Sequence, residues 1–518
     1  MKQIVSTDNK LYKWLILFNV MIGTFMAVLD STVVNTGLPT IMGTLGTDIN
    51  TAEWVLTAYM LALATVLPVA GWLADKYGYK LIFMLSLFVF TTGSFLCGNS
   101  TTIEELIFWR IYQGMGCGAI MPVGMAIVTN VFPPEERGVA LGFWAVASAA
   151  SVSFGPSIGG YLVDNLNWNY IFFVNVPVGA FALFFTAILQ KEFKNPDVHK
   201  FDFPGFITSV IFLPVFLYGL TEVNSSTNPQ GWNSPLVMGC MFVAFVSFTL
   251  FIYFELSSKN PMMDLRLFKD RNFALSNLVM FVFGIGMFGS TFLVPLYLQN
   301  SLGYSAFQSG LFFIPVGILQ GIASPLVGKW SQKFSPRFFI VTGLVLLALS
   351  FYLNQFFSYL TDAHYISVSL YIRGIGMGML FSPLMNMSLY NIPGRYMAQA
   401  SALINIIRQI GGSFGVTIMS YLLTKRVAFH TQIYNEALDS NGETYATVMR
   451  NLNQYVAQNA GASESLAHTY SSSIVNSHIH MEAYIGGIND DFYIAALITV
   501  FSILPVFFLT DKKFTKIK

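Results

Sequence analysis

Long apolar runs dominate the chain, and their length predicts helices that cross a membrane. A hydrocarbon core is spanned by about 20 apolar residues in an α-helix. Fourteen such runs occur, at about 14–38, 54–73, 80–98, 103–127, 138–163, 168–190, 203–221, 235–256, 273–298, 306–328, 337–359, 364–389, 397–424 and 491–510. The pattern therefore predicts an all-α membrane protein with 14 transmembrane helices.

The composition supports this class and disfavours others. The 518 residues are 54% hydrophobic and only 10% charged, whereas a soluble domain carries about a quarter charged residues. A net charge of +1 does not suit a nucleic-acid-binding protein. The three cysteines lie within apolar runs without polar partners at fixed spacing, so we expect neither a disulfide framework nor a metal site. The first run is too long for a signal-peptide core and predicts an uncleaved span.

Lys and Arg residues orient the predicted spans. They lie at the N-terminus, in alternate loops such as 73–80, 190–202 and 257–272, and in the C-terminal tail. The intervening loops 39–53, 99–102, 164–167, 222–234 and 299–305 contain none. Because cytoplasmic loops carry the excess of positive charge, we expect both termini to be cytoplasmic.

A polar stretch interrupts the pattern near the C-terminus. Residues 425–490 begin with Lys425-Arg426, and the topology places them outside; long loops translocate largely regardless of charge. The stretch contains His430, His468, His478 and His480, whose spacing matches no recognised ligand pattern. We expect a solvated external subdomain, which could contact a partner, rather than a metal site.

The chain contains an internal repeat. A shift of 257 residues aligns Pro68–Gly71 with Pro325–Gly328, and a shift of 260 aligns Gly114, Gly116 and Gly118 with Gly374, Gly376 and Gly378. Spans 1–6 thus repeat as spans 9–14, with spans 7 and 8 inserted. The predicted division is an N-terminus 1–13, a first half 14–190, an insert with flanking loops 191–272, a second half 273–510 and a tail 511–518. Two such halves with substrate bound between them near the midplane are a transporter design.

Asp30 is an acid within the otherwise uncharged first span. A charge at that depth costs about 2.5–3.5 kcal/mol, so we expect Asp30 to face a protein cavity and to carry protons. In span 4, Arg110, Gly114 and Gly118 share one face, beside Gln113, and the glycines allow close helix packing. Arg110 either extends to the outer interface or pairs with acids or carbonyls in the cavity and tunes a proton site.

Two further motifs contain glycine, one together with a proline and the other with an acidic residue. Span 5 contains Gly155-Pro156, where the proline kinks the helix, followed by Gly159 and Gly160. The cytoplasmic loop from Gly71 to Lys80 contains Asp75 and Gly78. Asp75 could bind a helix N-terminus or a cation in one conformation and release it in another; the alternative is an ordinary charged turn.

These motifs resemble the signatures of major facilitator drug:proton antiporters, and the segments Leu29–Asn35, Trp168–Gly179 and Asn405–Ser413 are similar to those of the fourteen-helix EmrB/QacA-type branch. The resemblance implies that Asp30 takes part in proton or substrate binding and Arg110 in proton coupling. It also implies that the span 5 motif marks antiporters and that Asp75 contributes to gating. Tyr79 departs from the basic residue common in the loop, and Lys80 is the candidate substitute.

The expected function is proton-driven efflux of drugs or amphiphiles, hence antibiotic resistance, across a bacterial cytoplasmic (inner) membrane. We expect no enzyme activity, no cofactor and no energy source beyond the proton motive force. Alternatives are an exporter of a specific metabolite, lipid or fatty acid, and a symporter. In a bacterium with two membranes, a periplasmic adaptor and an outer-membrane channel are the expected partners.

The candidate residues form three groups. Asp30 and Arg110 are the proton-coupling or substrate residues. The gating and packing group is Gly71, Asp75, Gly78, Lys80, Gln113, Gly114, Gly118, Gly155, Pro156, Gly159 and Gly160. The polar residues expected to line the cavity are Asn35, Arg373, Asn405, Arg408 and Gln409. Glu222 and Glu255 are expected at the interface, leaving one deep acid against three arginines; this balance favours neutral or anionic amphiphiles over dications.

Overall fold

The computed structural model describes residues 10–47, 49–194, 201–223, 225, 228–258, 261–331, 333–437, 443–460 and 464–510. The helices of the first half and the insert are α1 (Lys10–Leu45), α2 (Ile49–Tyr77), α3 (Tyr79–Gly98), α4 (Ile103–Val131), α5 (Pro134–Asn165), α6 (Tyr170–Phe173), α7 (Asn175–Leu189), α8 (Phe203–Glu222), η1 (Gly231–Asn233) and α9 (Pro235–Ser257). Those that follow are η2 (Leu265–Lys269), α10 (Arg271–Leu296), η3 (Tyr297–Ser301), α11 (Ala306–Leu311), α12 (Ile314–Trp330), α13 (Pro336–Asn354), α14 (Ala363–Leu389), η4 (Gly394–Tyr396), α15 (Met397–Ala437), α16 (Glu443–Ala460), α17 (Glu464–Phe501) and α18 (Ile503–Phe507).

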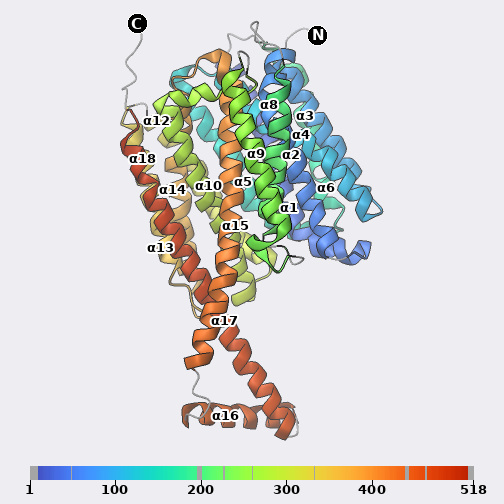
Figure 1. The fold of residues 1–518 in the computed structure, drawn as a ribbon, viewed down its shortest axis with the longest axis vertical. Coiled ribbons are helices and arrows are strands. Elements are labelled where there is room, and N and C mark those ends of the chain that lie inside the picture. Colours follow the sequence, from blue (N-terminus) through green and yellow to red (C-terminus); the bar gives the residue numbers. More distant parts are fainter. Residues whose placement is uncertain are drawn as a thin grey trace.

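The predicted all-α membrane fold is confirmed. In the described part of the chain, 13 helical segments are long and apolar enough to cross a membrane, and α5 packs among them against α1 and α12. With α5 they correspond to the fourteen predicted spans. Four spans are made of two helical segments. Helices α6 and α7 meet at Val174, α11 and α12 are separate, α10 continues into the π-helical η3, and α17 and α18 meet at Ser502. Figure 1 shows the resulting bundle of nearly parallel helices.

The internal repeat is visible in helix packing. In the first half α4 packs on α2 and α3, and α7 on α1 and α3; in the second half α14 packs on α12 and α13, and α17 on α10 and α13. A Cβ added to Gly114 would lie 2.5 Å from the Tyr59 carbonyl oxygen, and one added to Gly374 would lie 2.7 Å from that of Val316. Val316 follows Tyr59 by 257 residues. The glycines therefore allow backbone contact at matching places in both halves.

The two halves meet along two different seams. On one side α5 packs directly on α11, α12 and α14, closely enough that a Cβ on Gly142 would lie 2.9 Å from the backbone of Pro325. On the other side α2 meets α15, and the inserted α8 packs beside both. Thr417 of α15 donates a hydrogen bond to the Leu220 carbonyl (3.3 Å), and Tyr218 packs its ring 5.7 Å from Trp54 of α2. Among the described residues, the insert therefore packs on both halves at the α2–α15 seam and not at the α5 seam.

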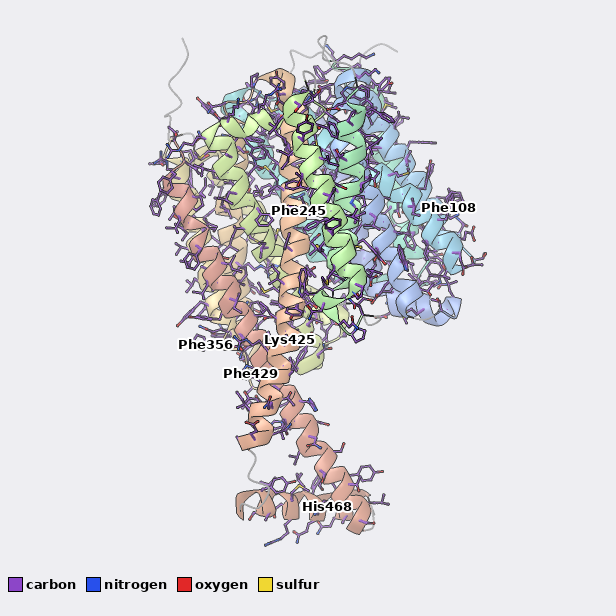
Figure 2. All side chains as sticks on the ribbon, in the orientation of Figure 1. Phe108, Phe245, Phe356, Lys425, Phe429 and His468 are labelled. Carbon is purple, nitrogen blue, oxygen red and sulfur yellow. The ribbon has the colours of Figure 1, made fainter. Side chains whose placement is uncertain are left out.

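The stretch 425–490 is a helical extension of the bundle. Helix α15 continues to Ala437 and α17 starts at Glu464, so both run past the predicted span ends at 424 and 491. Figure 1 shows them leaving the bundle as a stalk with α16 across its foot, at the end opposite to the first residues of α1 and the end of α18. In Figure 2, Lys425 and Phe429 lie at the base of this stalk and His468 near its foot. The predicted span ends where the chain stops being apolar. The helix continues beyond that point because residues 425–437 contain no glycine or proline that would end it.

The foot of the stalk has its own small core. Met449 and Val456 of α16 are 5% and 8% exposed, and Ala467 of α17 is 1% exposed. These positions follow helical spacing on the face that packs against α17. Among the described residues, no group of three His, Cys, Asp or Glu side chains could hold a metal ion. The foot is therefore a packed protein surface.

Candidate functional site

Asp30 and Arg110 form a buried ion pair between α1 and α4. Both side chains are fully buried, and Arg110 Nη1 lies 2.6 Å from Asp30 Oδ2. The Arg110 Nε donates to the Val55 carbonyl of α2 (2.9 Å), and the guanidinium carbon lies 3.9 Å from the Tyr59 ring centroid. The guanidinium is thus bound by an acid, a carbonyl and an aromatic face. Of the two alternatives for Arg110, the structure has the pairing and not the extension to the interface.

Neutral polar side chains complete the site around Asp30. Its Oδ1 accepts hydrogen bonds from Gln113 Nε2 and from Asn175 Nδ2, each at 2.9 Å. Both amides also reach Ser94 Oγ, at 3.0 and 3.1 Å, and Ser94 donates to the Phe172 carbonyl (3.0 Å). Three donors converge on one carboxylate, an arrangement that suits its ionised form. We call Asp30, Ser94, Arg110, Gln113 and Asn175 the Asp30 network.

The network lies inside the first half, away from the interface between halves. Its members come from α1, α3, α4 and α7, with the Val55 carbonyl from α2. Each of the five side chains is at most 1% exposed. A hydrophobic cluster that includes Leu106, Trp168 and Phe172 packs around it. Asp30 was expected to face a cavity, but here it is enclosed by protein, because its donors lie on neighbouring helices of the same half.

The network lies near one end of the bundle. Ser94 is four residues before the end of α3, and Arg110 is seven residues after the start of α4. At a rise of about 1.5 Å per residue, both lie within roughly 10 Å of the α3–α4 turn. Asn169 of the α5–α6 connection donates to the Gly98 carbonyl (2.6 Å) and covers that turn. Only a short thickness of protein therefore separates the ion pair from this end.

The span 5 motif connects the helix of Asp30 to the other half. A Cβ on Gly155 would lie 1.9 Å from Thr32 Oγ1, and one on Gly159 would lie 2.1 Å from Thr36 Oγ1. Because these two glycines have no side chain, α1 packs directly against α5 at Thr32 and Thr36, in the turns that follow Asp30. The opposite face of α5 contacts α11, where a Cβ on Gly310 would lie 2.4 Å from Ser157 Oγ and 3.3 Å from Pro156. Gly160 faces Phe307 of α11 at an ordinary contact distance of 3.7 Å.

The α2–α3 loop is a tight turn held by hydrogen bonds. Asp75 is 3% exposed, and its carboxylate accepts from the Tyr79 hydroxyl (2.7 Å). Gly78 has φ 113°, a conformation that favours glycine. Lys80 Nζ binds the Ala187 carbonyl (2.7 Å), so Tyr79 and not Lys80 is the residue of the loop that binds Asp75. Gly71, which precedes the turn, lies within α2.

The polar residues predicted for the cavity fall into different environments. Asn405 and Arg408 of α15 face α4 of the first half: Arg408 Nη2 lies 3.6 Å from Met121 Sδ and 3.1 Å from Asn405 Oδ1. Arg373 of α14 binds Thr291 Oγ1 (2.6 Å) within the second half. Gln409 is half-buried and Asn35 is exposed. Arg408 and Asn405 are therefore the pair that the structure brings to the contact between halves.

Two acids besides Asp30 are fully buried by protein. Glu255 was expected at the interface, yet its side chain is fully buried, with Oε2 accepting from the Met263 backbone (3.0 Å). Asp491, placed at the very start of the last span, is also fully buried. Glu255 stands three residues from the first residue after α9, at the span end where it was expected, so its burial is by protein. Hydropathy along the chain does not reveal this burial, because it comes from contacts with the Met263 backbone in one case and with neighbouring helices of the second half in the other.

Comparison with known proteins assigns the family. A family model described as Major Facilitator Superfamily matches residues 20–416. The chain belongs to the Major Facilitator Superfamily. It is 32% identical over 422 residues to the multidrug export protein EmrB of Escherichia coli, covering 81% of each chain. It is 29% identical over 494 residues to the fatty acid resistance protein FarB of Neisseria gonorrhoeae, covering 95% of each. The resemblance to the EmrB-type branch is thereby confirmed.

Solved structures agree on the fold of this major facilitator. The crystal structure of the human organic anion transporter MFSD10 matches 95% of this chain and 99% of its own with a TM-score of 0.59 at 12% identity. At that identity the likeness concerns the arrangement of helices alone. The two six-helix halves of the superfamily therefore frame the Asp30 network.

Sequence reasoning missed Ser94, Asn175 and Tyr59 as members of the site of this major facilitator. Ser94 and Tyr59 carry no distinguishing signal, since serine and tyrosine are common in membrane helices. Asn175 did carry one, because it stands within the apolar run 168–190 and opens α7 directly after the break at Val174. An amide at a helix start inside the membrane needs a partner, and here that partner is Asp30.

We predict strong thermodynamic coupling between Asp30 and Arg110. Arg110→Ala leaves a buried carboxylate without its counter-charge, so unfolding should become easier by about 3–5 kcal/mol. Adding Asp30→Asn should recover much of that loss, since no charge is then left unpaired. Thermal unfolding of the two single variants and the double variant in detergent measures the coupling. Additive losses would contradict it.

Proposed function

We propose that this protein exports lipophilic small molecules from the cytoplasm in exchange for protons. Its membership of the superfamily supports transport, and its similarity to EmrB over most of the chain supports multidrug efflux. The observation that carries proton coupling is the Asp30 network, a carboxylate and a guanidinium buried together among five helices. The proton motive force is the proposed source of energy, with no cofactor.

Protonation of Asp30 would change the forces within the first half. The ionised carboxylate binds Arg110, whereas the protonated form loses most of the Coulomb attraction that offsets burial of the guanidinium. Helix α1 would then be free to shift against α4. Because Thr32 and Thr36 of α1 lie against Gly155 and Gly159 of α5, a shift would reach the seam with α11 and α12. Rocking of the halves would exchange access to a substrate site between them.

The direction of exchange follows from the proposed orientation. The first residues of α1 and the end of α18 share one end of the bundle (Figure 1). The sequence predicts that the Lys- and Arg-rich loops lie on the same side, and we propose that this side is cytoplasmic in a bacterial inner membrane. The Asp30 network then lies nearer the outside. A proton would enter from there and leave towards the cytoplasm. Each charge crossing 100 mV supplies about 2.3 kcal/mol, roughly fiftyfold accumulation of exported compound.

Asp30→Asn tests proton coupling. The amide is isosteric but cannot exchange a proton, so the steady-state gradient of an exported compound should fall by up to roughly fiftyfold per coupled proton. Efflux of a compound panel from cells and from everted vesicles with an imposed pH gradient provides the measurement. Asp164→Asn is the matched control, since Asp164 is an exposed acid at the end of α5. Normal export by Asp30→Asn with unchanged pH dependence would remove Asp30 as the proton carrier.

A second candidate function is export of anionic amphiphiles such as fatty acids. With Arg110 neutralised by Asp30, the buried guanidinium groups of Arg373 and Arg408 have no acidic partner among the described residues. Arg408 lies where α15 meets Met121 of α4, so a carboxylate head beside Arg408 would place its tail among apolar side chains of both halves. The similarity to FarB, a fatty acid resistance protein, favours the same chemistry.

Arg408→Gln tests this substrate class. Removing one partner of a buried charge pair costs about 2–5 kcal/mol, so the apparent affinity for a lipophilic weak acid should fall at least about thirtyfold, while that for a dye dication should not fall. Transport assays with both compounds measure the change, and Arg266→Gln, at the cytoplasmic end of the insert, is the control. Wild-type preference for the dication would exclude anionic amphiphiles as the main substrates.

We propose that the stalk binds a periplasmic adaptor protein, itself joined to an outer-membrane channel, when the host has two membranes. The foot carries apolar side chains that are about half exposed, namely Tyr455 (65%), Tyr470 (54%) and Leu466 (52%). Exposed aromatic residues that project beyond the membrane are typical of protein interfaces. The stalk is also the part of the described chain that reaches farthest from the bundle (Figure 2).

Charge substitutions at the foot test for the adaptor. Tyr455→Lys with Tyr470→Lys should abolish co-purification of a co-expressed adaptor and leave the transporter folded, since both rings are mostly exposed. Gln454→Lys with Thr469→Lys adds the same charges at neighbouring exposed positions and serves as the control. Unchanged co-purification of the tyrosine variant would rule out this surface.

A further inference from the structure

Asp491 of α17 is a buried carboxylate that accepts no hydrogen bond from the described residues. Its side chain is fully buried, and neither carboxylate oxygen has a hydrogen-bond partner among the described residues. Asp491 shares one helical face with Ile488 and Ala495, which are 0% and 1% exposed. That face belongs to a helix packed on α10, α13 and α15. Asp491 therefore lies inside the second half.

The surroundings of Asp491 contrast with those of Asp30. Asp30 accepts bonds from a guanidinium and two amides, as an ionised carboxylate requires. An ionised Asp491 would keep two oxygens without hydrogen bonds in a protein interior, and a buried charge without such bonds tends to neutralise rather than persist. This conformation therefore suits an ionised Asp30 and a protonated Asp491.

The charged groups near Asp491 form a connection to the outside. Its neighbour Asp490 is about one-third exposed and lies 2.9 Å from His430 Nε2 and 3.5 Å from Arg426 Nε of α15. From Asn272 to Ser301, α10 and η3 carry no acid, base or histidine, and α13 carries one base, Arg337, at its far end. On α17, Tyr484 accepts a hydrogen bond from Asn300 of η3 (3.0 Å). Asp490 and His430 are thus the titratable pair between solvent and Asp491.

We propose that Asp491 is a second proton-binding site, located in the second half and reached from outside through Asp490 and His430. A proton from external water passes to the Asp490–His430 pair and then forms an O–H bond on the Asp491 carboxylate, and it leaves when the second half changes conformation. The helix of Asp491 packs on α10 and α13 as α7, which carries Asn175, packs on α1 and α3. Asn175 lies 14 residues before the end of α7, and Asp491 lies 16 before the end of α18.

This inference rests on the proposed proton-coupled export and extends it. Two carboxylates, one in each half, would allow the pump to exchange up to two protons per cycle. Because Asp30 suits the ionised form while Asp491 suits the neutral form, the two halves would load and release protons in alternation. Exchange of two protons per neutral molecule moves two charges, and each contributes about 2.3 kcal/mol per 100 mV.

Infrared difference spectroscopy of the purified full-length protein tests the proton on Asp491. The carbonyl stretch of a protonated Asp491 should be present in the wild type at neutral pH, lost in Asp491→Asn and retained in Asp164→Asn, where an exposed acid at the end of α5 is replaced. Asp491→Asn replaces the neutral acid with a neutral isostere, so its melting temperature should stay close to that of the wild type. A carbonyl band unchanged in Asp491→Asn, or a large loss of stability, would overturn the assignment.

Transport measurements then separate this site from the export function. In proteoliposomes, the number of protons exchanged per molecule, determined from the reversal potential, should fall by one in Asp491→Asn and stay unchanged in Asp164→Asn. An unchanged ratio in Asp491→Asn would contradict the second site while leaving export established. If the wild type exports none of the compounds, the proposed function fails, whereas the infrared result still reports whether Asp491 holds a proton.

Discussion

The buried pair of Asp30 and Arg110 is the interaction on which the first half depends. Two opposite charges removed from water remain stable only if their mutual attraction is supplemented by further hydrogen bonds. The structure supplies these from Val55 on α2, Gln113 on α4 and Asn175 on α7. Ordering those donors fixes the rotation of each helix. The pair is thus both an ionisable site and the reason that these helices hold one register.

The position of the pair explains how a proton bound in one half could move the other. Among the described residues, the side chains that bond Asp30 all belong to the first half. The connection instead runs through α1 into the glycines of α5, and through α5 into α11. Glycine makes such a connection stiff, because backbones in direct contact leave no flexible side chain to absorb a shift. On the side of α8, a Cβ on Gly231 would lie 3.9 Å from the Tyr421 ring of α15, which is an ordinary contact distance.

Sequence predicted the charged members of the site and missed the neutral ones for a physical reason. Asp30 and Arg110 stand out because a charge in an apolar run is costly, whereas Ser94 is unremarkable in any helix. The repeat anticipated which helices pack, since its glycines mark backbone contacts. The sequence pattern did not predict the helical stalk, because α15 and α17 continue past the apolar segments without a proline that would end a helix. Asp491 was misplaced for the same reason.

The two halves share the same helix packing but differ in the polar side chains at equivalent positions. A shift of 260 residues sets Arg373 on Gln113, and a shift of 257 sets Met287 on Asp30. In the first half the amide of Gln113 binds a carboxylate; in the second, Arg373 binds Thr291 and the carbonyl of Met287 (3.3 Å). The second half thus has a base where the first has an amide, and no acid opposite it. The same backbone frame therefore holds an ion pair in the first half and a guanidinium bound by neutral oxygens in the second.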